Sequence, residues 1–191
     1  MSLLVTGKHT EIVLTRGVGL HTVLGMTIDC AVGEVFDKAS TQFKKYEKVL
    51  RSEDAQQEFI DKYNKRMGKE VIPKDYFQSF INDEKMARGH YIEMLGRYGN
   101  PGEVELPMGL KSDQNADMSF TGLKTAILSR FHQQSEDRSI PLYERERKDL
   151  NFEQLLGYAA SIQYAILAPC RNKLDLSLRW LKNRDIPFNA I

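Results

Sequence analysis

The first thirty residues contain three short apolar segments that glycines separate, and this alternation restricts the fold more than any other feature of the chain. We expect the apolar segments to form β-strands because polar or turn-forming residues bound each of them; they are residues 3–6, 11–15 and 22–26. Gly7 stands at the first bend, and Gly17 and Gly19 stand at the second, where a tight turn needs the backbone freedom of glycine. The pattern predicts a hairpin or a meander.

Helical periodicity dominates the chain after the third strand. Asp29 is expected to cap a helix that begins shortly after it. Residues 42–96 are rich in charge and repeat aromatic residues at helical spacing, which predicts a small group of amphipathic helices. Another helix is expected to begin at Gly122, and a last one at Phe152. Pro169 is expected to end or kink that last helix.

Three other segments lack this periodicity. Residues 96–115 hold several glycines and prolines and predict a loop. Residues 118–120 predict a short strand directly before the helix at Gly122, and residues 133–149 predict a polar linker. Together with the amino-terminal strands, these elements place the chain in the α/β class.

The composition argues against several classes of protein. The 191 residues include 27 Lys and Arg and 26 Asp and Glu, so the formal net charge is +1, unlike that of a strongly basic nucleic-acid binder. No apolar run approaches the ~18 residues that span a bilayer, and we expect no membrane partner. No signal peptide is visible. Cys30 and Cys170 lack Cys or His neighbours at metal-ligand spacing, which favours a reducing compartment over a disulfide framework.

Two runs of basic residues leave two interpretations open. The runs are Lys44, Lys45 and Lys48, and Lys62, Lys65, Arg66 and Lys69. Both lie in the expected amphipathic helices, where they could face a polyanion. Glu and Asp residues nearby equally allow ordinary solvated helix faces, and the overall neutrality of the chain favours this second interpretation.

The dipeptide Gly7-Lys8 resembles part of a phosphate-binding P-loop, but the rest of that motif is missing. Ser2 stands where the motif has its first glycine, and His9 stands where it has Ser or Thr. A turn between two strands can still gather backbone amides and hydroxyls around a phosphate. Residues 6–10 are therefore a candidate phosphate-binding turn, with an ordinary hairpin turn as the alternative.

Four segments of the chain match, in order, four motifs of one protein family. Residues 3–10 are similar to L-L-V-S-G-G-H-T, residues 24–38 to L-G-x-T-x-D-D-A-x-G-E-x-F-D-K, and residues 117–125 to D-F-S-F-S-G-L-K-T. Residues 158–163 are similar to the helix motif A-A-S-x-Q. Over roughly a third of its length the chain thus resembles the tRNA threonylcarbamoyladenosine transferases of the TsaD type, formerly called O-sialoglycoprotein endopeptidases or glycoproteases.

The resemblance implies a partial actin-like ATPase (ribonuclease H-like) fold, with a mixed sheet, flanking helices and a helical insert. Residues 1–41 would hold the strand hairpin and helix of the actin-like domain, residues 42–98 the insert, and residues 99–191 the remainder of that domain. The implied activity is transfer of the threonylcarbamoyl group from threonylcarbamoyl-adenylate, or an ATP-like donor, to tRNA. The acceptor would be the adenosine next to the anticodon.

The resemblance also implies substrate-binding residues. The turn motif maps onto Leu4, Val5, Thr6, Gly7 and Lys8, which would contact the phosphate and acyl region of the donor. The motif G-E-x-F-D-K places its aspartate at Asp37, which would hold the ribose hydroxyls because a carboxylate accepts two hydrogen bonds. A solvated or cap-bonded Asp37 is the alternative. Lys124 is expected to be architectural and to pair with a carboxylate, with a direct contact to the donor or to tRNA as the alternative. The catalytic residues stay unknown.

Three departures from the family pattern bear on this assignment. Lys8 replaces the second glycine of the turn motif, where its side chain would either obstruct the donor or place an ammonium group near the donor's phosphate. Cys30 replaces the second aspartate of the D-D pair. The Y-P-G-G-P loop, which supplies a donor-binding glycine in the family, is not found. Lys8 and the missing loop favour the alternative of a non-catalytic actin-like scaffold or pseudoenzyme that pairs with an active paralogue.

A third hypothesis is a different actin-like phosphotransferase, such as a sugar kinase. It would need a catalytic aspartate in a phosphate loop, and residues 6–10 contain none. The older protease label has no support either, since no nucleophile–base pair can be assigned.

The family uses a divalent metal, iron or zinc, held by two histidines before the turn motif and by an aspartate after the A-A-S-x-Q helix. Met1 and Ser2 stand where the family has the two histidines, and the expected position of the metal-binding aspartate falls beyond Ile191. The four histidines, which are His9, His21, His90 and His132, form no pair at metal-ligand spacing. We therefore expect a central fragment that by itself lacks the metal ligands and is inactive.

Partners and compartment follow only from the resemblance. The expected partners are tRNA and either other proteins of the threonylcarbamoyladenosine pathway or a second copy of the chain. The variant Ser-Phe-Thr-Gly at residues 119–122 and the ending at residues 183–187 resemble the mitochondrial branch of the family. A mitochondrial location is the expectation, with a cytoplasmic one as the alternative.

Overall fold

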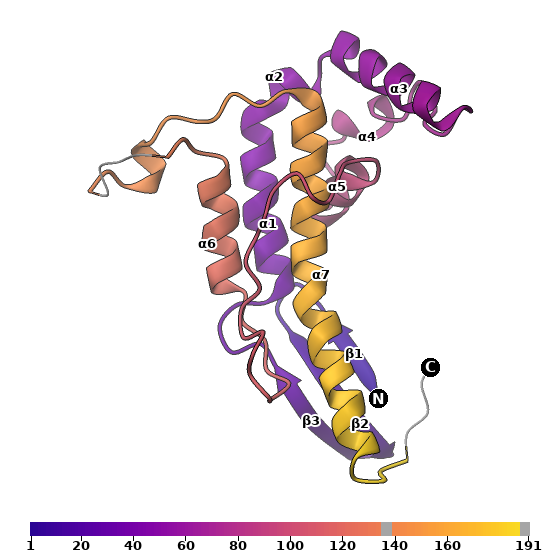
Figure 1. Cartoon of the computed structure of the whole chain (residues 1–191), viewed down its shortest axis with the longest axis vertical. Helices are drawn as coiled ribbons and strands as arrows, with labels where there is room; N and C mark the ends of the chain where they lie inside the picture. Colours follow the sequence, from indigo (N-terminus) through magenta and orange to yellow (C-terminus); the bar gives the residue numbers. More distant parts are fainter. Residues whose placement is uncertain (135–138, 188–191) are drawn as a thin grey trace. The chain divides into compact units, whose positions relative to one another are not determined.

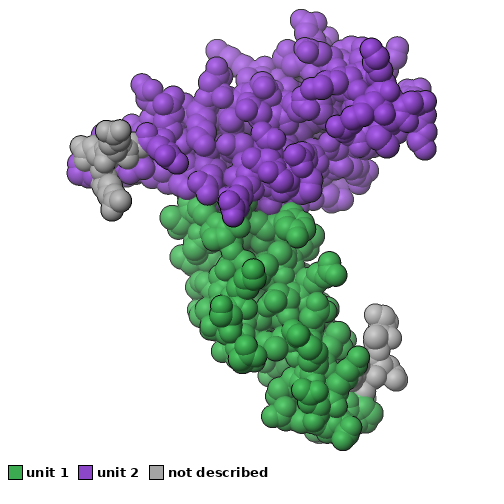
Figure 2. Space-filling view, viewed as in Figure 1, with its two compact units in different colours: residues 1–36, 106–126, 164–191 green, residues 37–105, 127–163 purple. Residues whose placement is uncertain are grey.

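The computed structural model describes residues 1–134 and 139–187. The chain divides into two compact units, which Figure 2 shows in different colours. Unit 1 contains Met1–Phe36, Leu106–Ala126 and Tyr164–Ile191, and unit 2 contains Asp37–Glu105 and Ile127–Gln163. Mixed α/β structure is confirmed, with the strands in unit 1 (Figure 1).

Unit 1 contains a three-stranded antiparallel sheet of order β1-β2-β3. β1 (Ser2–Val5) pairs with β2 (Thr10–Gly17), and β2 pairs with β3 (Leu20–Met26). The predicted meander is therefore confirmed. Gly19 has a φ of +75°, so the second turn needs a glycine there. Gly7 does not have a positive φ, so the backbone conformation of the first turn does not by itself require a glycine at this position.

One face of the sheet is buried. Thr10, Ile12 and Leu14 alternate along β2 and are at most 2% exposed, as the two-residue period of a strand requires. In Figure 1 the carboxy-terminal part of α7 (Phe152–Lys182) lies along the sheet. Trp180 of this part and Val23 of β3 line a common pocket within unit 1.

Pro169 was predicted to end or kink the last helix. α7 continues through Pro169 to Lys182, so an end at this proline is wrong, and a kink stays a prediction. A proline inside a helix removes one backbone hydrogen bond and costs about 3 kcal/mol. Buried residues nevertheless recur on one side of the helix beyond it, namely Cys170, Lys173, Ser177 and Leu181. Leu181 is fully buried, and burying one aliphatic side chain contributes about 1.5–3 kcal/mol. Lys173 also donates to the backbone oxygens of Asp113 and Asn115, and together these contacts offset the lost hydrogen bond.

α7 has 31 residues, and charged residues such as Arg171 and Asp175 lie on its exposed side. Among the residues that the structure describes, no helix combines the length and the apolar character that crossing a membrane requires.

Met118 forms a single parallel bridge with Thr27, so the strand predicted for residues 118–120 is wrong. The N–H of Met118 donates to Met26 O, and Met118 O accepts from the N–H of Ile28, both at 2.9 Å. The pairing ends there because a side chain, the carboxylate of Asp29, binds the N–H of Phe120 instead of a strand. α6 (Thr121–Arg130) then begins one residue before the predicted Gly122.

The loop predicted for residues 96–115 is confirmed, since α5 (Arg88–Gly96) is the last helix before α6. The linker predicted for residues 133–149 contains the short 3₁₀ helix η2 (Leu142–Glu144). Residues 135–138 of that linker lie outside the described part of the chain.

Unit 2 is helical, which confirms the prediction for residues 42–96. After the end of α1 (Val32–Phe43) the chain forms η1 (Lys44–Tyr46), α2 (Glu47–Leu50), α3 (Glu53–Met67), α4 (Gln78–Ile81) and α5. The predicted aromatic residues pack edge to face in its core: the Phe77 ring lies 5.0 Å from that of Phe152 and 6.0 Å from that of Phe59.

Two glycines let the loop after α5 lie directly against α7 within unit 2. A Cβ atom on Gly99 would be 2.1 Å from Leu156 O, and a Cβ atom on Gly157 would be 2.6 Å from the Cβ of Glu103. Any larger residue would push the loop away from the helix. This close approach fixes the position of residues 97–103.

We expect the substitution Lys173→Met to lower the free energy of unfolding by about 2 kcal/mol, because two hydrogen bonds from a buried, charged donor are lost. Lys173 is 1% exposed, and its Nζ donates to the carbonyl oxygens of Asp113 at 3.0 Å and Asn115 at 2.9 Å. Urea denaturation measures the change. Arg171→Met, at an exposed position of the same helix, is the control and should change stability by less than about 0.5 kcal/mol. Equal losses in both variants would contradict the assigned role of Lys173.

Candidate functional site

The hydroxyl of Thr6 closes the turn between β1 and β2. Thr6 Oγ1 accepts the N–H of Lys8 at 3.2 Å and the N–H of His9 at 2.8 Å. The N–H of Thr6 donates to His9 O at 2.7 Å. The backbone amides of Lys8 and His9 therefore already have an acceptor, and a phosphate that used them would have to replace the Thr6 hydroxyl.

The turn lies against the amino-terminal end of α1 within unit 1. A Cβ atom on Gly33 would be 2.4 Å from the Cα of Gly7, so only a glycine at position 33 allows this approach. The N–H groups in the first turn of a helix lack intrahelical acceptors and carry the partial positive charge of the helix dipole. The turn is thus placed beside a helix end that favours negative charge.

Lys124 and Glu34 tie the first turn of α6 to the first turn of α1. Lys124 Nζ lies 2.8 Å from Glu34 Oε1. This hydrogen bond raises the pKa of Lys124, so its ammonium group stays charged. The predicted pairing of Lys124 with a carboxylate is therefore confirmed.

Asp29 binds the start of α6 rather than the start of α1. Its carboxylate accepts the N–H of Phe120 at 2.9 Å and the N–H of Thr121 at 3.2 Å, together with the hydroxyl of Ser119. It also accepts the N–H of its neighbour Cys30 at 2.6 Å. The prediction that Asp29 caps the first helix is therefore wrong: its carboxylate caps a helix that begins 92 positions later in the chain.

Five of the six predicted substrate-binding residues are neighbours in unit 1. Leu4 and Val5 end β1, and Thr6, Gly7 and Lys8 begin the turn; all five are exposed.

Asp37 belongs to unit 2, where it is exposed. The backbone oxygen of Asp37 accepts the hydroxyls of Ser40 at 3.0 Å and Thr41 at 2.9 Å. Within residues 1–134 and 139–187 its carboxylate has no hydrogen-bond or ion-pair partner, so it stays able to accept donors from a ligand.

Cys30, which stands where the family has its second aspartate, is 6% exposed. Burial raises the pKa of its thiol. A protonated thiol is a weak nucleophile, and we assign no catalytic residue in this region.

The described residues do not fit the metal site that the resemblance implies. In the part of the chain that the structure describes, no three His, Cys, Asp or Glu side chains gather closely enough to hold a metal ion. Three of the histidines have other polar partners within the described residues. His21 Nδ1 lies 2.9 Å from the hydroxyl of Thr15, His90 Nδ1 lies 3.1 Å from Glu93 Oε2, and His132 Nδ1 lies 3.0 Å from Leu128 O.

Sequence reasoning missed the contributions of Gly33 and Thr10. Thr10 is fully buried, and its hydroxyl accepts the first N–H of α1, that of Val32, at 3.4 Å. Gly33 lies in the motif of residues 24–38, and an unexplained glycine in the first turn of a predicted helix was the available signal, because glycine lowers helix stability there.

The sequence profile of the TsaD family, the tRNA N6-adenosine threonylcarbamoyltransferases, matches residues 1–184. A tRNA N6-adenosine threonylcarbamoyltransferase from Brucella anthropi is 29% identical over 181 residues, which are 95% of this chain and 36% of that protein. One from Chromobacterium violaceum is 31% identical over 150 residues, or 78% of this chain and 32% of that protein.

The profile and both relatives point to one class of protein, the transferases that modify tRNA. The chain belongs to the TsaD family. It spans about a third of the length of the curated relatives that it matches.

We expect Asp29→Ala to lower the free energy of unfolding by about 1–2 kcal/mol, the range for loss of a helix cap. Urea denaturation near neutral pH measures the change. The control is Asp175→Ala, which removes the same charge from an exposed position on α7. A small or absent loss for Asp29→Ala would contradict the capping role.

The contribution of Asp29 should also depend on pH. Burial raises the pKa of Asp29, but hydrogen bonds from Ser119, Phe120, Cys30 and Thr121 outweigh burial and lower the pKa to about 2. Because the pKa is lower in the folded state, this stabilisation is complete above about pH 4 and is lost as the pH falls through about 2. The stability difference between the parent chain and Asp29→Ala should therefore shrink over this range, as denaturation at several pH values can measure. A constant difference would contradict the prediction.

Proposed function

We propose that this chain forms part of the donor-binding region of a tRNA N6-adenosine threonylcarbamoyltransferase. The donor would be threonylcarbamoyl-adenylate or an ATP-like precursor, and the acceptor would be the adenosine next to the anticodon of a tRNA. The observation that carries this proposal is the contact of Gly7 with Gly33, which brings the turn to the start of α1. A donor phosphate there would meet the partial positive charge of the helix end.

In the proposed transfer, the N6 amine of the adenosine forms a bond to the carbamoyl carbon of the donor. The bond between that carbon and the phosphate oxygen of the adenylate breaks, AMP leaves, and the amine loses one proton. Negative charge grows on the departing phosphate, so groups that stabilise it in the transition state accelerate the reaction.

The turn residues would act on that phosphate. Phosphate oxygens would take over from the Thr6 hydroxyl as acceptors for the amides of Lys8 and His9. The ammonium group of Lys8 is exposed and has no carboxylate partner within the described residues, so it would add a positive charge beside the phosphate. Leu4 and Val5 would contact the acyl part of the donor.

Asp37 would accept the two ribose hydroxyls of the donor. Its exposed carboxylate without a partner supports this role. An ionised carboxylate provides two oxygens for such bonds, and hydrogen bonds to a charged acceptor are stronger than neutral ones.

The remaining expectations concern the whole protein. We propose an actin-like fold, in which residues 1–41 and 99–191 belong to one domain and residues 42–98 form a helical insert. An iron or zinc site would lie on residues other than those described, and we derive no step through it. Pathway proteins or a second copy of the chain are proposed partners, and a mitochondrial location stays a prediction.

One observation favours a second candidate, the non-catalytic scaffold. The amides of Lys8 and His9 are already bonded to Thr6, so the turn is complete without a ligand. A scaffold that kept the family fold without binding the donor would retain this closed turn.

Calorimetric titration of the 191-residue chain with a non-hydrolysable threonylcarbamoyl-adenylate analogue tests the proposal. We expect Gly33→Ala to weaken binding about tenfold or more, because the added Cβ would displace the turn from the helix end. Gly122→Ala is the matched control, since nothing lies within 4 Å of a Cβ at that position. Lys8→Ala leaves the packing unchanged and should weaken binding severalfold, through the lost charge alone.

No binding by the parent chain, or equal affinities of Gly33→Ala and Gly122→Ala, would contradict the proposed donor site. The scaffold is tested with the intact protein that contains this chain. Modification of tRNA in vitro would reject the scaffold, whereas donor binding without modification would favour it.

A further inference from the structure

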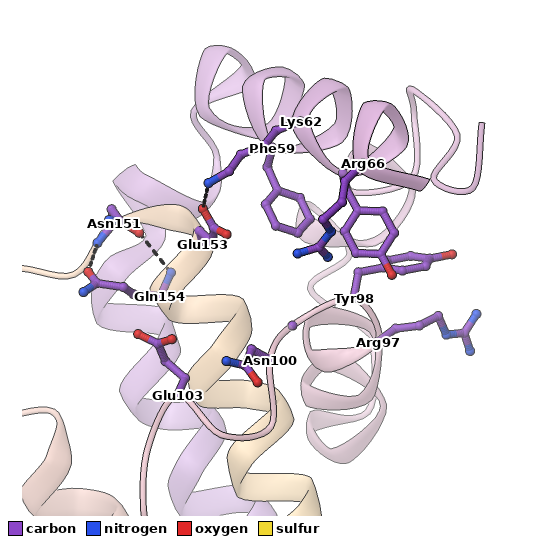
Figure 3. Close-up of a pocket in the computed structure, with 12 residues that line it drawn as sticks. Phe59, Lys62, Arg66, Arg97, Tyr98, Asn100, Glu103, Asn151, Glu153 and Gln154 are labelled. Carbon is purple, nitrogen blue, oxygen red and sulfur yellow. Dashed lines mark hydrogen bonds and ion pairs between the residues drawn. The ribbon is translucent and has the colours of Figure 1, made fainter. Parts of the chain in front are cut away.

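A second group of polar and aromatic side chains lines a pocket within unit 2. The pocket has a volume of about 490 Å³ and lies between α3, the segment after α5 and the start of α7 (Figure 3). Sites for small organic ligands commonly have volumes of about 300–1,000 Å³. No residue of the proposed donor site lines it.

Arg66 is the cation of this pocket that stays available for a ligand. Lys62 is paired with Glu153 at 2.6 Å, and Arg97 lies 3.5 Å from Glu93. Figure 3 shows the Arg66 side chain directed into the pocket, whereas Arg97 points away from it. Within the described residues Arg66 has no carboxylate partner; its guanidinium carbon lies 4.9 Å from the centre of the Tyr63 ring.

Two tyrosine rings form an aromatic wall beside Arg66. The rings of Tyr63 and Tyr98 meet edge to face, with centroids 5.5 Å apart, and both side chains are partly exposed. Tyr98 also packs against the ring of Tyr76 at 5.0 Å, which holds its position. Partly exposed rings with fixed positions are suited to stacking against a planar group.

Amide groups on the other side of the pocket present donors. Asn151 Oδ1 accepts the N–H of Gln154 at 2.9 Å, and Gln154 Oε1 accepts the N–H of Asn151 at 3.0 Å. Asn100 Oδ1 likewise accepts the N–H of Gly102 at 3.0 Å. Because each side-chain oxygen is bonded to the backbone, the NH₂ groups of these amides remain as donors for carbonyl or phosphate oxygens.

The charges restrict the ligand to one anionic group. After Lys62 and Glu153 pair, Arg66 is the cation directed into the pocket, while the carboxylate of Glu103 also lines it. A ligand with several carboxylates, such as an acidic peptide, would place negative charge beside Glu103. One phosphate near Arg66, a planar ring near the tyrosines and hydroxyl or amine donors near Glu103 would match all three groups.

We propose that this pocket binds a nucleoside monophosphate unit, either as a free nucleotide or as one unstacked nucleotide of an RNA strand. The phosphate lies at Arg66, the base stacks against Tyr63 or Tyr98, and base carbonyls accept the amide donors. This inference does not depend on the proposed donor site.

Calorimetric titration of the 191-residue chain with UMP, a short oligouridylate, ribose 5-phosphate and an acidic hexapeptide tests the proposal. We expect Arg66→Glu to weaken UMP binding about tenfold or more, because a charge-assisted phosphate contact is lost. Lys65→Glu is the matched control: both residues are basic and exposed in the last turn of α3, but Lys65 does not line the pocket. Lys65→Glu should change the affinity less than about twofold. Gly33→Ala should leave UMP binding unchanged, which separates this pocket from the donor site.

Tighter binding of UMP than of ribose 5-phosphate would support stacking of the base. Tighter binding of the oligouridylate than of UMP would identify RNA as the source of the nucleotide. Equal affinities for UMP and the oligouridylate would identify the free nucleotide as the ligand. The proposal is overturned if the parent chain does not bind UMP, if Arg66→Glu and Lys65→Glu weaken binding equally, or if ribose 5-phosphate or the peptide binds as tightly as UMP.

Discussion

The carboxylate of Asp29 connects the end of the sheet to the start of α6, and the geometry of the candidate site in unit 1 depends on this connection. Because the carboxylate binds the N–H of Thr121, α6 begins there, and Lys124 falls on its first turn. From that position Lys124 reaches Glu34 on the first turn of α1. The start of α1 therefore contacts both α6, through this ion pair, and the turn at Gly7. A low pKa follows from the same hydrogen bonds, since they stabilise the ionised form.

The candidate turn is closed by its own side chain. The hydroxyl of Thr6 binds the two amides that the proposed donor phosphate would use. A charged phosphate is a stronger acceptor than a neutral hydroxyl, so exchange of one for the other is favourable once the phosphate has lost its water. Lys8, which departs from the family motif, projects from the same turn and would add to the attraction for an anion.

Most helices and strands could be predicted from the sequence, but the tertiary contacts that decide where they begin and end could not. Apolar segments between glycines were sufficient to predict three strands, and aromatic spacing was sufficient to predict the helices of residues 42–96. The expected helix end at Pro169 was wrong because the effect of a proline on its own backbone can be predicted locally, whereas the burial of side chains beyond it cannot. Residues 118–120 misled it because a carboxylate, rather than another strand, binds the N–H of Phe120.

Local periodicity, glycine positions and family motifs can be read along the chain, and by themselves they determined the α/β class, the meander and the candidate turn. The binding partner of Asp29, the approach of Gly33 to Gly7 and the grouping of Arg66 with Tyr98 were decided by the tertiary structure alone. The physical reason is that hydrogen bonds and close backbone contacts join segments far apart in sequence. A residue's type shows what it can bind, but only the folded chain brings a particular donor, glycine or ring to it.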